Sequence, residues 1–190
     1  MKKSLFLMTA VLWTGLLAAE DIVGLPINGD FRGRPAGYSP VPGWFLSADG
    51  GAALVRPTRN RHEFCLELAA APTRPQSVVT ALHPLSGSLL KLEVKFSGRG
   101  VATVGYETFD SSRRVRLAAD RQVLKLTPDD QKLKRCFTLT TRASYIRIRL
   151  TAEAGAMARF HGVKAEISGP KLTAPAPAPA PASTAAPAAK

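Results

Sequence analysis

The chain has 190 residues, with 26 Lys and Arg against 14 Asp and Glu and a formal net charge of +12. This length allows one domain with a single substantial core, and beyond the first 19 residues no segment is apolar enough to cross a membrane. The charge favours anionic surroundings or partners, although it fits equally well with a role in solubility alone.

Residues 1–19 are typical of a secretory signal peptide. Two lysines precede an apolar run that ends at Leu17 and is shorter than the ~20 residues needed to span a bilayer. Ala18 and Ala19 offer a cleavage site, so we predict a cut after Ala19 and a secreted, periplasmic or cell-surface protein that is not integral to a membrane. An uncleaved anchor is the alternative.

The predicted mature chain keeps 24 basic and 14 acidic residues. Its expected partners are therefore polysaccharide or another anionic surface polymer, or else an exported protein. Nucleic acid is not expected as a partner of an exported protein.

Residues 20–170 form the predicted domain, and apolar side chains recur at every second position within it. The alternation is clear in 64–68, 90–96 and 146–150, where it predicts half-buried strands. The further predicted strands are 101–109, 115–117 with 123–126, 136–140 and 163–167. Seven or eight short strands of this kind predict an all-β fold, a two-sheet antiparallel β-sandwich.

Turn-forming residues separate these strands. They occur at Pro84, 86–88, 97–100 and 128–130. Gly98, Arg99 and Gly100 are interpreted as a hairpin turn rather than as a phosphate-binding loop.

The chain has two cysteines, Cys65 and Cys136. Alternation places both on the outward faces of their strands, and an even pair in an exported protein tends to form a disulfide. A bridge would require their strands to be neighbours; two free thiols are the alternative.

The strand 145–150 is the strongest candidate for a ligand-binding surface. Its period of two sends the aliphatic side chains inward and leaves Tyr145, Arg147 and Arg149 in one outward row. Guanidinium groups suit carboxylate or sulfate, and Tyr offers a ring for stacking. If 136–140 is the neighbouring strand, Thr138 and Thr140 add hydroxyl groups to this row. An ordinary solvated strand face is the alternative.

Basic residues also cluster in three predicted loops, each of which can be plain solvated surface. We include Arg113 and Arg114 among the candidate ligand-binding residues. The three clusters are Arg56, Arg59 and Arg61 before His62; Arg113, Arg114 and Arg116; and Lys132, Lys134 and Arg135.

No catalytic pattern emerges from the sequence. His62, His83 and His161 lie far apart, and no H-E-x-x-H, G-x-S-x-G or P-loop motif occurs. Strand carboxylates can form a glycosidase pair, but outward acidic side chains are more often plain surface. We apply that interpretation to Glu63, Glu67, Glu93 and Glu107, and we predict that the protein is not an enzyme.

Residues 171–190 consist almost entirely of Ala and Pro, with strict alternation at 174–181. Proline fixes φ and removes a hydrogen-bond donor, so this composition predicts a disordered, extended tail. A spacer that threads a wall layer or contacts a partner is the alternative.

The run Ile27-Asn28-Gly29-Asp30-Phe31, followed by Pro42-Gly43-Trp44, resembles the opening of family 4 and 9 carbohydrate-binding modules. The order and spacing of elements agree over most of 25–168. The resemblance implies a jelly-roll sandwich of the galactose-binding-domain type and a glycan ligand. It also implies that Trp44 packs in the core rather than against a sugar.

That family commonly holds a structural calcium ion between its first and last strands. Here Arg32 stands in place of the family's Glu, and His161 and Gly162 stand in place of its paired Asp. The expected carboxylates are missing, so we expect no metal and no cofactor, and bound calcium is disfavoured.

These observations lead to two hypotheses. The first is a non-catalytic module that binds an anionic or neutral glycan at the cell surface or wall. The second is a structural or protein-interaction domain of the envelope that has no sugar ligand.

Overall fold

The computed structural model describes residues 22–170, apart from 49–50, 59–62 and 141. The predicted signal peptide and Pro/Ala tail, as well as Arg59, Arg61 and His62, lie outside the described residues. Within the described part of the chain, no helix is long and apolar enough to cross a membrane.

The described residues form eleven strands. They are β1 (Val23–Gly24), β2 (Trp44–Ala48), β3 (Gly51–Pro57), β4 (Phe64–Ala70), β5 (Gln76–Thr80), β6 (His83–Pro84), β7 (Leu89–Phe109), β8 (Arg116–Leu126), β9 (Gln131–Thr138), β10 (Tyr145–Ala152) and β11 (Met157–Ser168). The predicted all-β class is confirmed. The sequence pattern missed β1, β2, β3, β5 and β6.

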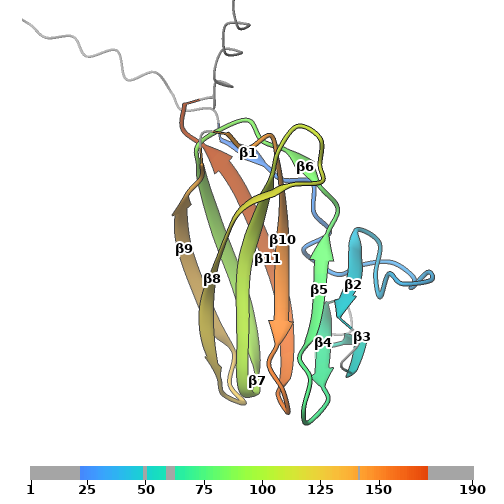
Figure 1. Cartoon of the computed structure of the whole chain (residues 1–190). Helices are drawn as coiled ribbons and strands as arrows, with labels where there is room; N and C mark the ends of the chain where they lie inside the picture. Colours follow the sequence, from blue (N-terminus) through green and yellow to red (C-terminus); the bar gives the residue numbers. More distant parts are fainter. Residues whose placement is uncertain (1–21, 49–50, 59–62, 141, 171–190) are drawn as a thin grey trace, which may run out of the picture.

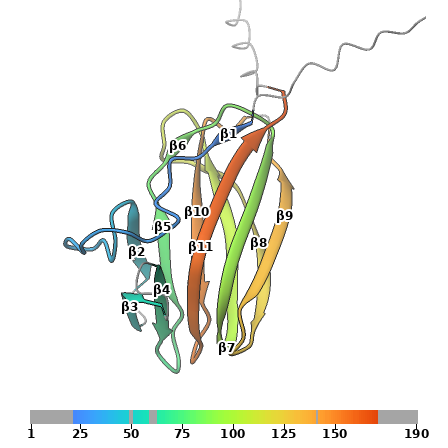
Figure 2. The same ribbon diagram turned by 180° about the vertical axis from the view of Figure 1, so that it is seen from behind.

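The strands form two antiparallel sheets that pack face to face, as predicted (Figure 1). The front sheet has the order β2-β5-β10-β7-β8, and β6 extends the line of β5 along β10. The back sheet has the order β3-β4-β11-β7-β9, and β1 extends the line of β4 along β11 (Figure 2).

Aliphatic and aromatic side chains from both sheets fill the space between them. Ile146, Ile148 and Leu150 are fully buried, as the alternation in this strand predicts. They pack with inward side chains of the neighbouring strands to form one core. The back sheet contributes Leu66, Leu68, Leu90, Leu92, Val94, Phe96, Phe160 and Ile167.

A single strand, β7, belongs to both sheets. Residues 89–96 pair with β9 and β11, whereas 100–109 pair with β8 and β10. The change of sheet occurs at Gly98 and Gly100, which have φ values of 141° and 87°. The predicted hairpin turn is therefore wrong: the two halves of β7 do not pair with each other but face each other across the core.

The predicted disulfide does not form. Cys65 and Cys136 are free. Both lie in the back sheet, but β11 and β7 separate their strands β4 and β9. Three inter-strand spacings amount to about 14 Å, far beyond the reach of a disulfide.

The amino-terminal motif packs into the core at the edge where β2 begins. Trp44 is fully buried, its ring centroid lies 5.7 Å from that of Phe31, and its indole Nε1 donates to the Asn28 carbonyl oxygen at 2.8 Å. The expectation that Trp44 is structural is confirmed. The backbone N–H of Val163 donates to the Gly29 carbonyl, so the first segment is tied to the last strand.

Candidate functional site

The outer face of the front sheet carries the predicted row of Tyr145, Arg147 and Arg149. The neighbours of β10 are β7 on one side and β5 on the other. Arg147 pairs with Glu107 of β7, and Arg149 pairs with Gly105. Because paired residues share a face, this row lies beside β7 side chains rather than beside the predicted threonines.

Thr138 and Thr140 are not part of this face. Thr138 ends β9 and pairs with Leu89 in the back sheet, and Thr140 follows it in a loop. The prediction that they flank Tyr145 and the two arginines was therefore wrong. Its cause is the crossing of β7, which separates the partners of its first half from those of its second half.

A groove of ≈ 630 Å³ runs across this face. Gly105 lies at its centre, between Arg121 of β8 and Arg149 of β10 on the same rung of the sheet. A Cβ atom on Gly105 would lie 2.2 Å from the Asp120 carbonyl oxygen, so the close approach of β8 requires glycine. The other lining residues are Thr103, Tyr106, Glu107, Arg116, Ala119, Asp120 and Thr151.

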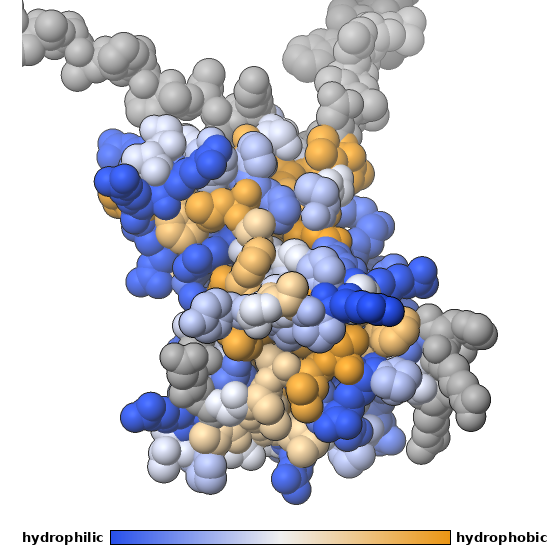
Figure 3. All heavy atoms as spheres, turned by 90° about the vertical axis from the view of Figure 1, so that its right-hand side faces the viewer, coloured by the Kyte–Doolittle hydropathy of each residue, from blue (hydrophilic) through white to orange (hydrophobic). Residues whose placement is uncertain are grey.

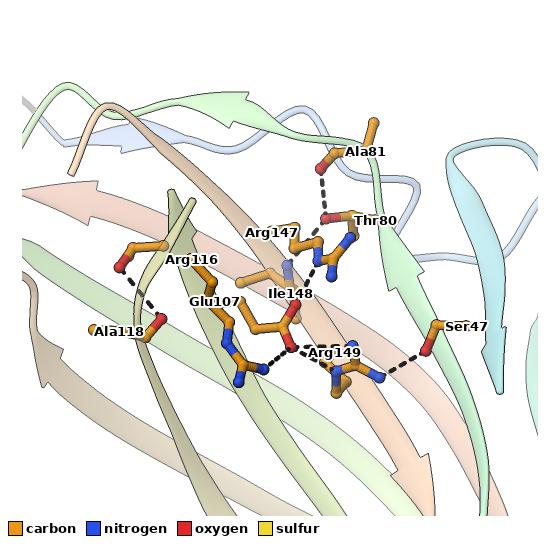
Figure 4. A network of polar contacts seen from close by, with 10 residues as sticks. Ser47, Thr80, Ala81, Glu107, Arg116, Ala118, Arg147, Ile148 and Arg149 are labelled. Atoms are coloured by element: carbon orange, nitrogen blue, oxygen red, sulfur yellow. Dashed lines mark hydrogen bonds and ion pairs between the residues drawn. The ribbon is translucent and has the colours of Figure 1, made fainter. Parts of the chain in front are cut away.

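Three arginines converge on the carboxylate of Glu107 (Figure 4). Arg147 Nε donates to Glu107 Oε2 at 2.5 Å, and Arg149 Nη2 lies 3.0 Å from Glu107 Oε1. Arg116 Nη1 lies 3.4 Å from the same oxygen. The Glu107 side chain is only 5% exposed, whereas those of Arg147 and Arg149 are 29% and 30% exposed. The carboxylate is an internal counter-ion beneath the guanidinium groups.

The electrostatics of this cluster keep Glu107 ionised. Burial alone would raise its pKa, but hydrogen bonds and charges from Arg147 and Arg149 outweigh burial and hold the pKa below its usual value. The interpretation of Glu107 as plain surface was wrong. An outward-facing position does not guarantee exposure, because long arginine side chains can cover a shorter neighbour.

Contacts beyond Glu107 restrict the arginines further. Arg149 Nη1 donates to Ser47 Oγ at 2.6 Å, and the Arg147 guanidinium lies 4.9 Å from the centroid of the Phe109 ring. The sequence pattern signalled neither contact, because β2 and β7 are distant from β10 along the chain.

The loop between β7 and β8 brings a further predicted residue to Tyr145. Arg113 stacks on the Tyr145 ring at 4.4 Å and donates from Nη2 to the Tyr145 hydroxyl at 3.0 Å. Its neighbour Arg114 is exposed, and its backbone N–H donates to Ser112 Oγ. Arg113 therefore belongs to the upper end of this face, while Arg114 lies in the same loop.

The described members of the three basic clusters do not meet at one site. Arg56 lies on β3 at one edge of the back sheet, and Lys132, Lys134 and Arg135 lie on β9 at its other edge. Arg116, on β8 in the front sheet, is the member of the middle cluster that lines the groove.

A second buried carboxylate lies on the outer face of the back sheet. Arg56 Nε and Arg159 Nε each lie 2.9 Å from an oxygen of Glu67, whose side chain is 7% exposed. The interpretation of Glu67 as plain surface was also wrong. Burial alone would raise its pKa, but the hydrogen bonds and charges of the two arginines outweigh burial and lower the pKa of Glu67.

One group of side chains has the residue types of a catalytic triad but not its geometry. Ser97 Oγ lies 2.8 Å from His161 Nε2, and Asp130 Oδ1 lies 3.2 Å from the same nitrogen. A triad requires the carboxylate and the hydroxyl on opposite ring nitrogens. In the described part of the chain, no group of three His, Cys, Asp or Glu residues is placed to hold a metal ion.

Two exposed aromatic residues lie at the β2 edge of the front sheet. Phe45 is 42% exposed on the outer face, and Tyr38 is 81% exposed in the loop before β2. Figure 3 shows this side of the molecule, where apolar and hydrophilic side chains lie next to one another. The Tyr38 carbonyl accepts the backbone N–H of Leu46, which anchors the loop to β2.

No family model and no curated protein matches the chain. Solved structures resemble it in fold. The family 11 carbohydrate-binding module of the cellulase Lic26A-Cel5E from Clostridium thermocellum is 11% identical, with a TM-score of 0.55 over 78% of this chain and 97% of the module. An exo-β-agarase is 8% identical, with a TM-score of 0.52 over 76% of this chain and 25% of the agarase.

The enzymatically active domain of tailspike protein 4 from bacteriophage CBA120 is 11% identical, with a TM-score of 0.54 over 65% of this chain. The chain spans only 19% of that tailspike domain. Identities this low show the fold alone, and that fold is the predicted jelly-roll sandwich. The narrower resemblance to families 4 and 9 stays a prediction.

Proposed function

We propose that this protein is a non-catalytic glycan-binding module and that its ligand lies in the groove of the front sheet. The groove itself is the observation that carries the proposal. It lies on the outer face of β7, β8 and β10, and it is lined by the guanidinium groups of Arg116, Arg121 and Arg149, whose donors suit the hydroxyls of a sugar.

The fold supports this assignment. A family 11 module from the same organism, 97% of whose length is covered by this chain, has also been solved with a β-1,3-1,4-mixed-linked tetrasaccharide. The enzymes that match do so over only 19% and 25% of their chains, a share that fits an accessory domain. The proposed setting is the cell surface or wall, and it rests on the signal-peptide pattern of 1–19.

A bulky side chain in the groove tests the proposal. Ala119 is exposed, lies on β8 and lines the groove, so Ala119→Trp should fill the space beside Glu107 without removing any polar contact. We expect the full chain to bind at least one polysaccharide on a glycan array and Ala119→Trp to weaken that binding roughly tenfold or more.

The matched control is Ala52→Trp, on the edge strand β3 of the other sheet, where the alanine is also exposed. Equal loss of binding in both variants would contradict the groove as the site. Absence of binding to every glycan, with the chain folded by circular dichroism, would overturn the proposed function.

One observation favours a protein-interaction domain as the second candidate. Tyr38 projects from its loop with 81% of its surface exposed, beside an exposed Phe45. Exposed aromatic residues are enriched in protein interfaces. On this alternative, Tyr38→Ser abolishes capture of an exported partner, while Ala119→Trp leaves it unchanged.

A further inference from the structure

The groove has an excess of positive charge that is not neutralised within the face. Its lining contains three arginines and two carboxylates, and Arg113 and Arg147 lie on the same face just beyond it. Glu107 is covered by its arginines, and Asp120 Oδ1 accepts the backbone N–H of Arg121. A ligand in the groove therefore meets more guanidinium groups than carboxylates, and Asp120 is the exposed carboxylate of the lining.

The positions of the arginines fit an anionic group on a sugar ring. Arg121 and Arg149 flank Gly105 on one rung of the sheet, so two inter-strand spacings, about 9.5 Å, separate their Cα atoms. Within the described part of the chain, no hydrogen bond or ion pair engages the Arg121 guanidinium. All of its donors are available to a carboxylate or sulfate, which a guanidinium binds in a bidentate manner.

Stacking on an aromatic ring is not available in this groove. Tyr106 is the aromatic residue of the lining, and it is 5% exposed. On the same face, Arg147 covers the ring of Phe109 and Arg113 covers that of Tyr145, whereas the exposed Phe45 lies at the β2 edge, outside the lining. Neutral sugars are commonly held by an exposed ring face, so recognition within the groove lining itself relies on charge and hydrogen bonds.

From these contacts we infer that the groove selects glycans whose sugar units carry carboxylate or sulfate groups. This inference rests on the proposed function. Arg121 binds the anionic group directly, while Glu107 holds Arg149 in a fixed orientation at the groove and Arg147 just beyond it (Figure 4). Side chains held in place before binding lose less conformational entropy when the ligand arrives.

Affinity electrophoresis of the full chain tests the inference with defined polymers. The probes are polygalacturonate for carboxylates, a sulfated galactan for sulfates, and mixed-linkage β-glucan and xylan as neutral glycans. Polyglutamate serves as an anionic polymer without sugar. We expect binding to at least one acidic glycan, at least tenfold weaker at 0.5 M than at about 0.05 M salt, with polyglutamate bound less well.

The diagnostic variant is Arg121→Glu, because this side chain is exposed and makes no hydrogen bond or ion pair with another side chain among the described residues. We expect it to weaken binding to the acidic glycan about tenfold or more. The control is Arg74→Glu, which makes the same change of charge in an exposed turn between β4 and β5. It should change affinity less than twofold.

The outcomes separate the inference from the proposed function. Binding to a neutral glycan alone overturns the inference and leaves the glycan-binding function standing. Equal binding of polyglutamate and acidic glycan, or equal effects of the two charge reversals, also overturns the inference, because binding would then depend on non-specific charge attraction. Binding to no polymer overturns the inference, and the proposed function is overturned with it only if the glycan array also shows no binding.

Discussion

At the scale of single residues, Glu107 decides how the candidate ligand-binding row behaves. Sequence alternation places Arg147 and Arg149 on one outward face, and the structure confirms that placement. The pattern cannot show that a carboxylate on the next strand binds both, because the register between β7 and β10 depends on the whole sheet. The sequence therefore predicts correctly which way these side chains face, but it does not predict the carboxylate that they bind.

The buried carboxylate leads to a prediction on stability. In Glu107→Gln, Arg147 and Arg149 keep their partly buried charges but lose their counter-ion, so we expect the free energy of unfolding to fall by about 2 kcal/mol at pH 7. Urea unfolding followed by circular dichroism measures this loss. Glu93→Gln is the matched control, because Glu93 and its two lysine partners are more exposed to solvent. This substitution should lower the free energy of unfolding by less than Glu107→Gln does.

The pH dependence of stability in wild type and in Glu107→Gln checks whether charge is the cause of the expected loss. The folded-state pKa of Glu107 lies below the ordinary value of 4.5, so its ionised form stabilises the fold above that pH. This contribution is lost as the pH falls through the lowered pKa. The difference between wild type and Glu107→Gln should therefore be constant above about pH 5 and shrink below 4.5. A difference that persists at pH 2 would show that packing, not charge, is its source.

At the scale of elements, β7 organises the molecule. Its two halves were predicted as strands at 90–96 and 101–109, and both are strands. The prediction of a hairpin turn between them was wrong, because the local sequence Gly-x-Gly is compatible both with a hairpin turn and with a corner inside one strand. The deciding fact is the identity of the partner strands, and these come from residues up to 79 positions away, as in the pairing of Leu89 with Ser168.

The corner in β7 gives a prediction on its glycine. A Cβ atom on Gly98 would lie 2.1 Å from the Met157 carbonyl oxygen, and its φ of 141° is unfavourable for other residues. We expect Gly98→Ala to lower the free energy of unfolding by more than about 2 kcal/mol, measured by urea denaturation.

Two control glycines separate the clash from the backbone strain. Gly155→Ala retains a positive φ of 73° but meets no atom within 4 Å, so it should cost only about 1 kcal/mol. Gly24→Ala meets neither problem and should change stability by less than about 0.5 kcal/mol. Equal costs for Gly98 and Gly155 would mean that the corner tolerates a side chain.

At the scale of the whole molecule, the sequence predicts the class of fold better than its connections. The period of two is a local property, and it correctly predicts a sandwich with Ile146, Ile148 and Leu150 in its core. The order of strands is a global property. Both errors of placement, the threonines beside β10 and the disulfide, arise from strands assumed to be neighbours that the structure separates.

The reactivity of the two cysteines tests the arrangement of the back sheet. Cys136 is exposed on an edge strand, whereas Cys65 is 4% exposed and burial raises the pKa of its thiol. Since the thiolate is the reactive form, a maleimide should label one thiol per chain rapidly and the second only when the back sheet opens. Mass spectrometry over time, with Cys136→Ser as the variant that removes the fast site, measures both steps.

The slow step reports on global stability because β4 lies inside the back sheet, between β3 and β11. Exposure of Cys65 requires at least one of those pairings to break, so its labelling rate should rise with urea in parallel with unfolding. Gly98→Ala, which weakens the contact between β7 and β11, should accelerate the labelling of Cys65 but not that of Cys136. Two fast thiols in the native protein would contradict the burial of Cys65, and a chain with no free thiol would contradict the strand order of the back sheet.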